Sequence, residues 1–375
     1  MIRSRRNSYF LLLFLKMGAA IVSLRCLRVL RIEFSMMEDG QQSMGKAQLY
    51  PLRFDPIYQY RVWGGRRLSG LLSAPLPGDG PIGEAWVLSD RTDHQSLVAN
   101  GQLKGQTLGQ VMGQYQEQLM GKLSSRFRRF PLLLKFLDAH AMLSVQVHPS
   151  DAHPELIPAG DTAKTEAWVV IEAGNGSRIY AGLKAGTTAG DLRRSLATGT
   201  IADHLVGIVP KPGDSVFIPA GTVHTLGGDV VVFEIQQNSD VTFRLYDWGH
   251  VDAKTGQPRP LQVDQALASI DFANRNSSLV TPTVVSTTPV ECEKLFDCEH
   301  FLLWRLRGES PFNVGAAEMP RVLVCIEGSG WLEGEGSTYG VEKGEVWLLP
   351  AVIGACEFHP KDAVTLLEVA LPESS

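Results

Sequence analysis

Four polar residues in three short stretches of the chain could together hold a metal ion. The stretch LSVQVHPSD at 143–151 alternates as a strand does, which places Gln146 and His148 on one face and apolar residues on the other. Glu166 and His224 stand in two further strand-like stretches, TEAWVV and TVHTL. Two imidazoles, a carboxylate and an amide oxygen suit a borderline divalent cation, with zinc favoured and iron, cobalt or manganese open. A catalytic ion must keep a position for water or substrate, so we expect an open site.

An internal repeat indicates the fold that would position these residues. Residues 211–224 (KPGDSVFIPAGTVH) resemble 342–355 (EKGEVWLLPAVIGA), and VVIEAGNG at 169–176 resembles LVCIEGSG at 323–330. Each copy reads as strand, glycine turn, strand, Gly-acid turn, strand and Pro turn. This layout predicts a mainly β protein with two cupin-like jelly-roll units and helical insertions.

The two copies differ at the positions that carry chemistry. His224 of the first copy corresponds to Ala355 of the second, and Glu166 corresponds to Arg321. Turn glycines and prolines serve the fold and occur in both copies, whereas the imidazole and the carboxylate occur in one. The second unit is therefore predicted to be degenerate and metal-free.

The pattern along the chain predicts three parts. Residues 1–43 begin with basic residues, continue with an apolar run and end with several arginines. We expect that they come from an over-extended gene start; a disordered tail and an export signal are the alternatives. Residues 44–257 are predicted to form the catalytic cupin domain, with helical insertions near 103–130 and 184–207. Residues 258–375 are predicted to hold a linking helix and the degenerate cupin domain.

Composition excludes several classes of protein. The chain has 375 residues, 44% hydrophobic and 20% charged, with a formal net charge of −5, which argues against a nucleic-acid partner. Lys16 interrupts the N-terminal apolar run, so no membrane span is expected. The five cysteines form no CxxC pair, which favours free thiols in a reducing cytoplasm. We expect a monomer or a homodimer.

Cations flank the predicted metal site. Lys135 lies inside the apolar stretch LLLKFLDA, Lys164 precedes Glu166 by two residues, and Arg244 follows Glu234 in EIQQNSDVTFRLYDW. Cations that share an inward face with a metal need an anion, which a phosphorylated or carboxylated substrate would supply. The residues alone predict a metal-dependent cupin. Two histidines with one carboxylate also suit a non-haem iron oxygenase.

In these motifs the chain resembles the type I mannose-6-phosphate isomerases (phosphomannose isomerases), in their shorter bacterial form. The matching pieces, in family order, are RVWGG, IGEAW, LLLKFLDA, LSVQVHPSD, KTEAW, IPAGTVHTLG and EIQQNSDVTFRLYDW, and they cover about 51–250 strongly. The resemblance implies one zinc ion per chain, held by Gln146, His148, Glu166 and His224. It also implies interconversion of mannose 6-phosphate and fructose 6-phosphate.

That reaction gives the flanking residues expected roles. A proton leaves C2 and reaches C1 through an enediolate, and Arg244 is expected to meet the developing negative charge. Lys164, whose pKa we expect a neighbouring dication to lower, and Glu234 compete as the carbon base. Lys135 and Ser144 are expected to contact the phosphate. A non-catalytic sugar-phosphate-binding cupin and an iron oxygenase are the alternatives.

Overall fold

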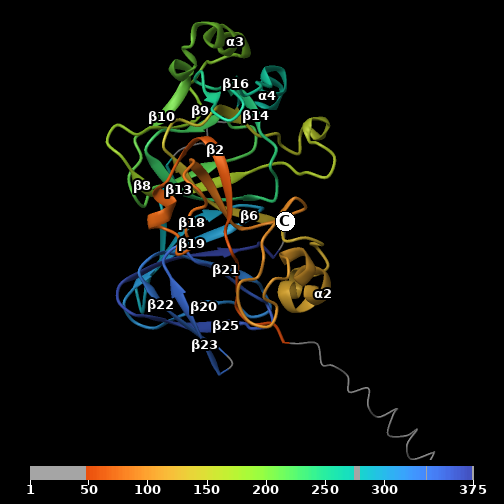
Figure 1. The fold of residues 1–375 in the computed structure, drawn as a ribbon, viewed down its shortest axis with the longest axis vertical. Helices are drawn as coiled ribbons and strands as arrows, with labels where there is room; N and C mark the ends of the chain where they lie inside the picture. Colours follow the sequence, from red (N-terminus) through yellow and green to blue (C-terminus); the bar gives the residue numbers. More distant parts are fainter. Residues whose placement is uncertain (1–47, 274–278, 335, 374–375) are drawn as a thin grey trace, which may run out of the picture. The chain divides into compact units, whose positions relative to one another are not determined.

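The computed structural model describes residues 48–273, 279–334 and 336–373; the segment 1–43 discussed above lies outside them. The described chain is mainly β, as predicted, and its strands form two pairs of packed sheets. Figure 1 shows strands such as β8 and β13 of the first pair in the upper part of the view and β21 and β25 of the second pair below them.

The first pair consists of a six-stranded and a five-stranded antiparallel sheet. The six-stranded sheet contains, in spatial order, β11 (Ser215–Ile218), β8 (Glu166–Ala173), β13 (Val230–Gln237), β6 (Leu132–Ala139), β2 (Ile57–Gly65) and β3 (Ile82–Leu88). The five-stranded sheet contains β10 (Leu205–Ile208), β9 (Ile179–Leu183), β12 (His224–Leu226), β7 (Val145–Val147) and β14 (Phe243–Tyr246). Leu137 and Trp168 of the first sheet pack with Ile179 and Leu226 of the second, so the two sheets lie face to face.

The second pair has the same kind of arrangement. Its seven-stranded sheet contains β1 (Leu52–Arg53), β24 (Val346–Leu349), β21 (Arg321–Glu327), β26 (Val364–Ala370), β19 (Leu302–Gly308), β18 (Glu291–Asp297) and β17 (Thr283–Ser286). Its four-stranded sheet contains β20 (Phe312–Gly315), β25 (Ala355–Pro360), β22 (Ser329–Gly334) and β23 (Ser337–Glu342). Leu323 and Leu366 pack against Leu332 and Phe358 between these sheets.

One apolar core joins the two pairs. Phe136 and Phe233, on the outer face of the six-stranded sheet, share a buried cluster with Leu303 and Val369 of the seven-stranded sheet. The four sheets are therefore stacked in layers, with apolar side chains at every contact. Two short ribbons complete the strands: β4 (Asp90–Arg91) with β5 (His94–Gln95), and β15 (Val251–Asp252) with β16 (Gln257–Pro258).

The α-helices of the described residues are short. They are α2 (Leu108–Met120), α3 (Ala189–Thr198) and α4 (Val263–Ser269), and the 3-10 turns are η1 (Arg67–Gly70), η2 (Gly121–Leu123), η3 (Pro154–Leu156) and η4 (Ile201–His204). Helices α2 and α3 begin at threonine caps with complete capping boxes. Among the residues described, no helix is both long enough and apolar enough to cross a membrane.

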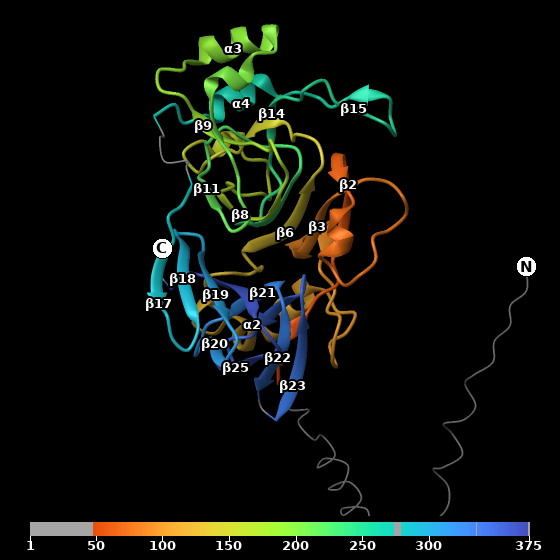
Figure 2. The same ribbon diagram turned by 90° about the vertical axis from the view of Figure 1, so that its left-hand side faces the viewer.

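Helices α3 and α4 cover the outer face of the five-stranded sheet (Figures 1 and 2). Val145 and Val147 of β7 belong to the same buried cluster as Leu192 of α3 and Ala266 of α4. Since side chains alternate along a strand, Gln146 between the two valines is turned the other way, toward the six-stranded sheet.

The strand register repeats in the two pairs. Glu166 opens β8 and pairs with Ile218 of β11, and Arg321 opens β21 and pairs with Leu349 of β24. His224 is likewise the first residue of β12, as Ala355 is of β25, the strand that follows β24. The positions compared in the sequence repeat thus occupy corresponding places in their sheets.

Candidate active site

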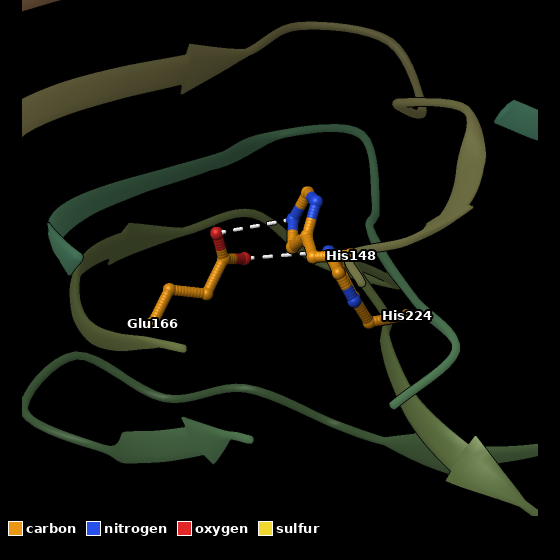
Figure 3. Close-up of side chains that lie close together, drawn as sticks. All are labelled: His148, Glu166 and His224. Atoms are coloured by element: carbon orange, nitrogen blue, oxygen red, sulfur yellow. Dashed lines mark ion pairs between the residues drawn. The ribbon is translucent and has the colours of Figure 1, made fainter. Parts of the chain in front are cut away.

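His148, Glu166 and His224 meet between the two sheets of the first pair (Figure 3). His148 Nε2 lies 3.3 Å from Glu166 Oε2, and His224 Nε2 lies 3.3 Å from Glu166 Oε1. Figure 3 shows the carboxylate directed at both imidazole rings. All three side chains are buried, with relative exposures of at most 1%.

The other ring nitrogen of each histidine is held by the backbone. His148 Nδ1 lies 2.7 Å from the carbonyl oxygen of Val241, and His224 Nδ1 lies 2.9 Å from that of Thr222. A carbonyl can only accept, so each Nδ1 carries a proton and each neutral ring turns the lone pair of Nε2 toward Glu166. Backbone carbonyls orient metal-binding histidines in this way.

The charges of the cluster fit a metal ion. Burial lowers the pKa of His148 to about 3, with the nearby charge of Lys164 adding to the effect, and burial also lowers the pKa of His224. The pKa of Glu166 lies well below its usual range, because Lys164 and the two imidazoles outweigh the opposing effect of burial. Near neutral pH the cluster offers two imidazole lone pairs and a carboxylate within 4.8 Å of one another. It is a candidate metal site.

Gln146, the proposed fourth ligand, lies beside this cluster. Its strand position is in register with both His224 and Arg244. Gln146 Nε2 lies 3.2 Å from His224 Nε2, and Gln146 Oε1 accepts a hydrogen bond from Ser144 Oγ at 3.2 Å. Exchanging the amide oxygen and nitrogen by rotation would turn the oxygen toward the cluster.

A cavity of about 400 Å³ adjoins the cluster. Its lining includes the remaining predicted site residues, which come from both sheets and from the segment before β8: Lys135, Ser144, Gln146, Lys164, Glu234 and Arg244. The structure therefore brings every residue of the predicted site to one place. Gln146 and Lys164 line the cavity and also contact the metal-site cluster, so they connect the two.

Lys164 is buried beside the metal-site cluster. Its Nζ lies 2.6 Å from Glu166 Oε2 and 3.1 Å from His148 Nε2. Burial favours the neutral amine, but the carboxylates of Glu166 and Glu234 outweigh it and raise the pKa of Lys164. The expected lowering of this pKa rests on a dication beside the lysine, so it stays a prediction for the metal-loaded chain.

Glu234 shows the opposite shift. Burial raises its pKa, and the nearby charge of Glu166 adds to the effect, while Lys135 opposes it. Glu234 Oε2 accepts a hydrogen bond from Trp168 Nε1 at 2.9 Å, and Oε1 lies 3.2 Å from Lys135 Nζ. Lys135 Nζ is also 3.9 Å from Glu84 Oε2. The ammonium group of Lys135 therefore lies between two carboxylates.

Two further arginines, Arg61 and Arg259, line the cavity. The sequence analysis did not predict either of them. Arg259 pairs with Asp247 at 2.9 Å. Burial lowers the pKa of Arg244, and the charge of Arg259 lowers it further, so an anion near both guanidinium groups would relieve their repulsion. Arg244 Nη1 donates to the Pro260 carbonyl oxygen at 2.8 Å. The short segment QPRP around Arg259 has no alternation of apolar and polar residues. The direction of the Arg259 side chain could therefore not be predicted from the sequence.

Known proteins resemble this chain over most of its length. Residues 52–167 match the model of the phosphomannose isomerase type I catalytic domain. The probable mannose-6-phosphate isomerase GmuF of Bacillus subtilis (strain 168) is 33% identical over 322 residues, which are 83% of this chain and 99% of the relative. The mannose-6-phosphate isomerase of Streptococcus mutans is 33% identical over 312 residues, 82% of this chain and 95% of the relative. The chain belongs to the type I mannose-6-phosphate isomerase family.

The fold agrees with this family assignment. A crystal structure of the mannose 6-phosphate isomerase from Bacillus subtilis matches with a TM-score of 0.79 at 28% sequence identity, covering 86% of this chain and 100% of the other. The resemblance read from the sequence motifs and the mainly β, cupin-like fold are thereby confirmed. The family model includes Gln146, His148 and Glu166 and ends before His224, which β12 brings to the same place through its pairing with β7.

Proposed function

We propose that this chain interconverts mannose 6-phosphate and fructose 6-phosphate. The observation that carries the proposal is the position of the buried His148–Glu166–His224 cluster directly beside a cavity lined by cations and by the carboxylate of Glu234. The family relatives are named as isomerases of this sugar phosphate, which favours this activity over a non-catalytic sugar-phosphate-binding cupin or an iron oxygenase.

The proposed cofactor is one zinc ion per chain, held by His148, Glu166, His224 and the amide oxygen of Gln146. Two imidazoles with oxygen donors suit zinc, which keeps an open coordination position in catalytic sites. When bound, the ion supplies positive charge beside the cavity, which stabilises negative charge on the reacting oxygens. His148 and His224 are already oriented for this role by their Nδ1 contacts to backbone carbonyls.

The proposed proton transfers use Glu234 and Lys164. Because its pKa is raised, Glu234 is a stronger base than an ordinary carboxylate and is our choice as the group that takes the proton from C2 and returns it to C1. Lys164 has a raised pKa, so near neutral pH its Nζ is protonated. In the direction of fructose 6-phosphate it donates this proton to O1 and takes a proton back from O2. Arg244 stays charged and stabilises the enediolate oxygens.

The substrate phosphate is proposed to bind at Lys135 and Ser144, and Arg259 is a further candidate for this contact. Lys135 Nζ lies between Glu84 and Glu234, which already balance much of its charge. Arg259 reaches the cavity near Arg244, and a guanidinium group can hold a phosphate through two parallel hydrogen bonds.

The proposed organisation of the chain follows the repeat. Residues 44–257 provide the catalytic cupin unit, 258–375 the linking helix and a degenerate unit that lacks counterparts of Glu166 and His224, and 1–43 are dispensable. We further propose that the protein acts in the cytoplasm as a monomer or a homodimer.

Metal analysis of the purified protein, combined with a coupled assay for fructose 6-phosphate, tests this proposal. About one equivalent of zinc per chain is expected, with turnover that chelation abolishes and added zinc restores. Metal-loaded protein that binds the sugar phosphate without turnover would favour the non-catalytic cupin. Oxygen consumption with an iron-loaded protein would favour the oxygenase.

A further inference from the structure

A second cavity, of about 450 Å³, shares two chain segments with the active-site cavity. In the segment before β8, Thr162 lines the second cavity and Lys164 lines the active-site cavity. In β13 and the residues that follow it, Gln237 and Asn238 line the second cavity, whereas Glu234 and Asp240 line the active-site cavity. None of the residues given a role in the proposed reaction lines the second cavity.

The second cavity concentrates positive charge. Four arginines line it, Arg91, Arg126, Arg128 and Arg129, against one carboxylate, Glu299. Three of the arginines come from the single stretch SSRFRRFP that follows α2. The chain as a whole carries a formal net charge of −5, so this concentration does not reflect the overall composition.

The arginines are only partly neutralised by the protein. Arg91 pairs with Asp161 at 3.0 Å, so its charge is balanced. Arg129 donates to the hydroxyl of Thr92 at 2.8 Å and to the Asp90 carbonyl at 3.4 Å, and the Asp90 carboxyl balances part of its charge. Arg126 donates to the Pro372 carbonyl at 3.1 Å, which supplies no negative charge. Within the part of the chain that the structure describes, no hydrogen bond or ion pair involves the Arg128 side chain. The one carboxylate of the lining is also close to an imidazole: Glu299 Oε1 lies 3.3 Å from His300 Nε2.

We propose that this second cavity is an effector site that binds a phosphate-bearing small molecule. Guanidinium groups match the geometry and the charge of a phosphate group. The apolar remainder of the wall, which includes Phe127, Pro131 and Leu132, suits the non-ionic part of such a molecule. The volume is in the range of small-molecule sites. This inference does not depend on the proposed isomerase activity.

Hydrogen bonds link the effector site to the active site. Arg91 Nη1 donates to the Asn238 carbonyl at 3.0 Å, and the Asn238 amide nitrogen donates to the Pro131 carbonyl at 2.9 Å. Gln237 Oε1 accepts from the Thr165 amide at 2.8 Å, next to Lys164 and Glu166. A ligand bound at 126–131 would therefore contact residues that are hydrogen-bonded to the segments carrying the active-site carboxylates and lysine.

Titration calorimetry of the metal-loaded full chain with inorganic phosphate, at fixed ionic strength, tests the site. Wild type is compared with Arg128→Ala and with Arg178→Ala, whose exposed arginine lies outside the lining of both cavities. The expected result is a binding event that Arg128→Ala weakens roughly tenfold or more, the scale of one charge-assisted hydrogen bond, and that Arg178→Ala retains. Turnover without phosphate should be the same in all three proteins.

Amide hydrogen exchange provides a second readout. Phosphate should protect 126–131 and 237–239 in wild type and in Arg178→Ala, and the protection should be lost in Arg128→Ala. If Arg128→Ala is poorly folded, Arg128→Gln serves in its place. Equal binding by all the proteins would assign the phosphate to the active-site cavity alone and overturn the proposal, as would the absence of saturable binding.

Discussion

Lys164 Nζ and Glu166 Oε2 lie 2.6 Å apart, so the carboxylate that faces both imidazoles also fixes the lysine of the cavity wall. A substitution of Glu166 would therefore disturb the candidate metal site and the proposed catalytic lysine together. His224, whose Nε2 faces Glu166 and whose Nδ1 contacts the Thr222 carbonyl oxygen, separates the two effects better.

His224→Ala should lose both metal and activity, because the remaining ligands would hold the ion far more weakly. Alanine stands at the corresponding position, Ala355, of the second copy. Metal analysis and the isomerase assay check this, with His153→Ala as the control, since His153 is exposed and pairs only with Glu155 among the described residues. A His224→Ala protein that retains a full equivalent of zinc would contradict the ligand assignment.

Arg244→Lys should reduce turnover more than substrate binding. Lysine keeps the charge and loses the fork that spans two oxygens, so a loss of roughly a hundredfold or more in kcat is expected, as for one oxyanion donor. Steady-state kinetics with mannose 6-phosphate, and binding measured separately, give the comparison. Arg259→Lys is the matched variant and should mainly raise KM. Near-normal kcat with a greatly raised KM in Arg244→Lys would move Arg244 to the phosphate site.

Glu234→Gln should remove the acid limb of the pH profile of kcat. A carboxylate base works only when ionised, and burial raises the pKa of Glu234 above its ordinary 4.5. Wild-type kcat should accordingly fall as the pH drops through this raised pKa, at a higher pH than for an exposed glutamate. The variant should lose about 10²- to 10⁴-fold in kcat, the usual contribution of a positioned acid or base.

Glu84→Gln is the control for that profile. Arg61 and Lys135 outweigh burial and lower the pKa of Glu84 to about 2, so Glu84 stays ionised throughout and its loss should leave the acid limb in place. An acid limb that persists at the same pH in Glu234→Gln would rule out Glu234 as the carbon base.

Deletion of residues 1–43 should leave a folded and active protein. GmuF is matched over 99% of its length by 83% of this chain, and the described core begins with Leu49, which is 2% exposed. Activity and melting temperature of the truncated protein measure the effect. A deletion of residues 1–53, which also removes β1 (Leu52–Arg53), is the contrasting variant and should be destabilised. Insolubility of the shorter deletion would show that 1–43 contribute to the fold.

The sequence predicted which residues lie together where one strand carried the information. Gln146 and His148 follow from alternation alone, and the loss of His224 and Glu166 from the second copy identified the other two candidates. The influence of Glu234 on the pKa of Lys164 could not be predicted, because Glu234 is distant in sequence and is brought close by the pairing of β13 with β8.

Helix ends were predicted less well than helix positions. The expected helical segment extended to residue 130, whereas α2 ends at Met120. Gly121 ends it with φ of +54°, and a β-carbon there would lie 2.1 Å from the Glu318 carbonyl oxygen. That contact comes from a part of the chain almost two hundred residues away, so no local pattern indicates it.

The pairing of β1 with β24 bears on how the protein unfolds. Leu52 and Arg53 lie in register with Leu348 and Trp347 of the C-terminal sheet, while β2, the next strand along the chain, belongs to the first sheet pair. The strands thus pass from one sheet pair to the other after β1 and again after α4, and a shared apolar core lies between the pairs. A break after residue 257 would leave one fragment with an unpaired β1 and both with exposed core. Heating should accordingly melt both sheet pairs in one cooperative transition.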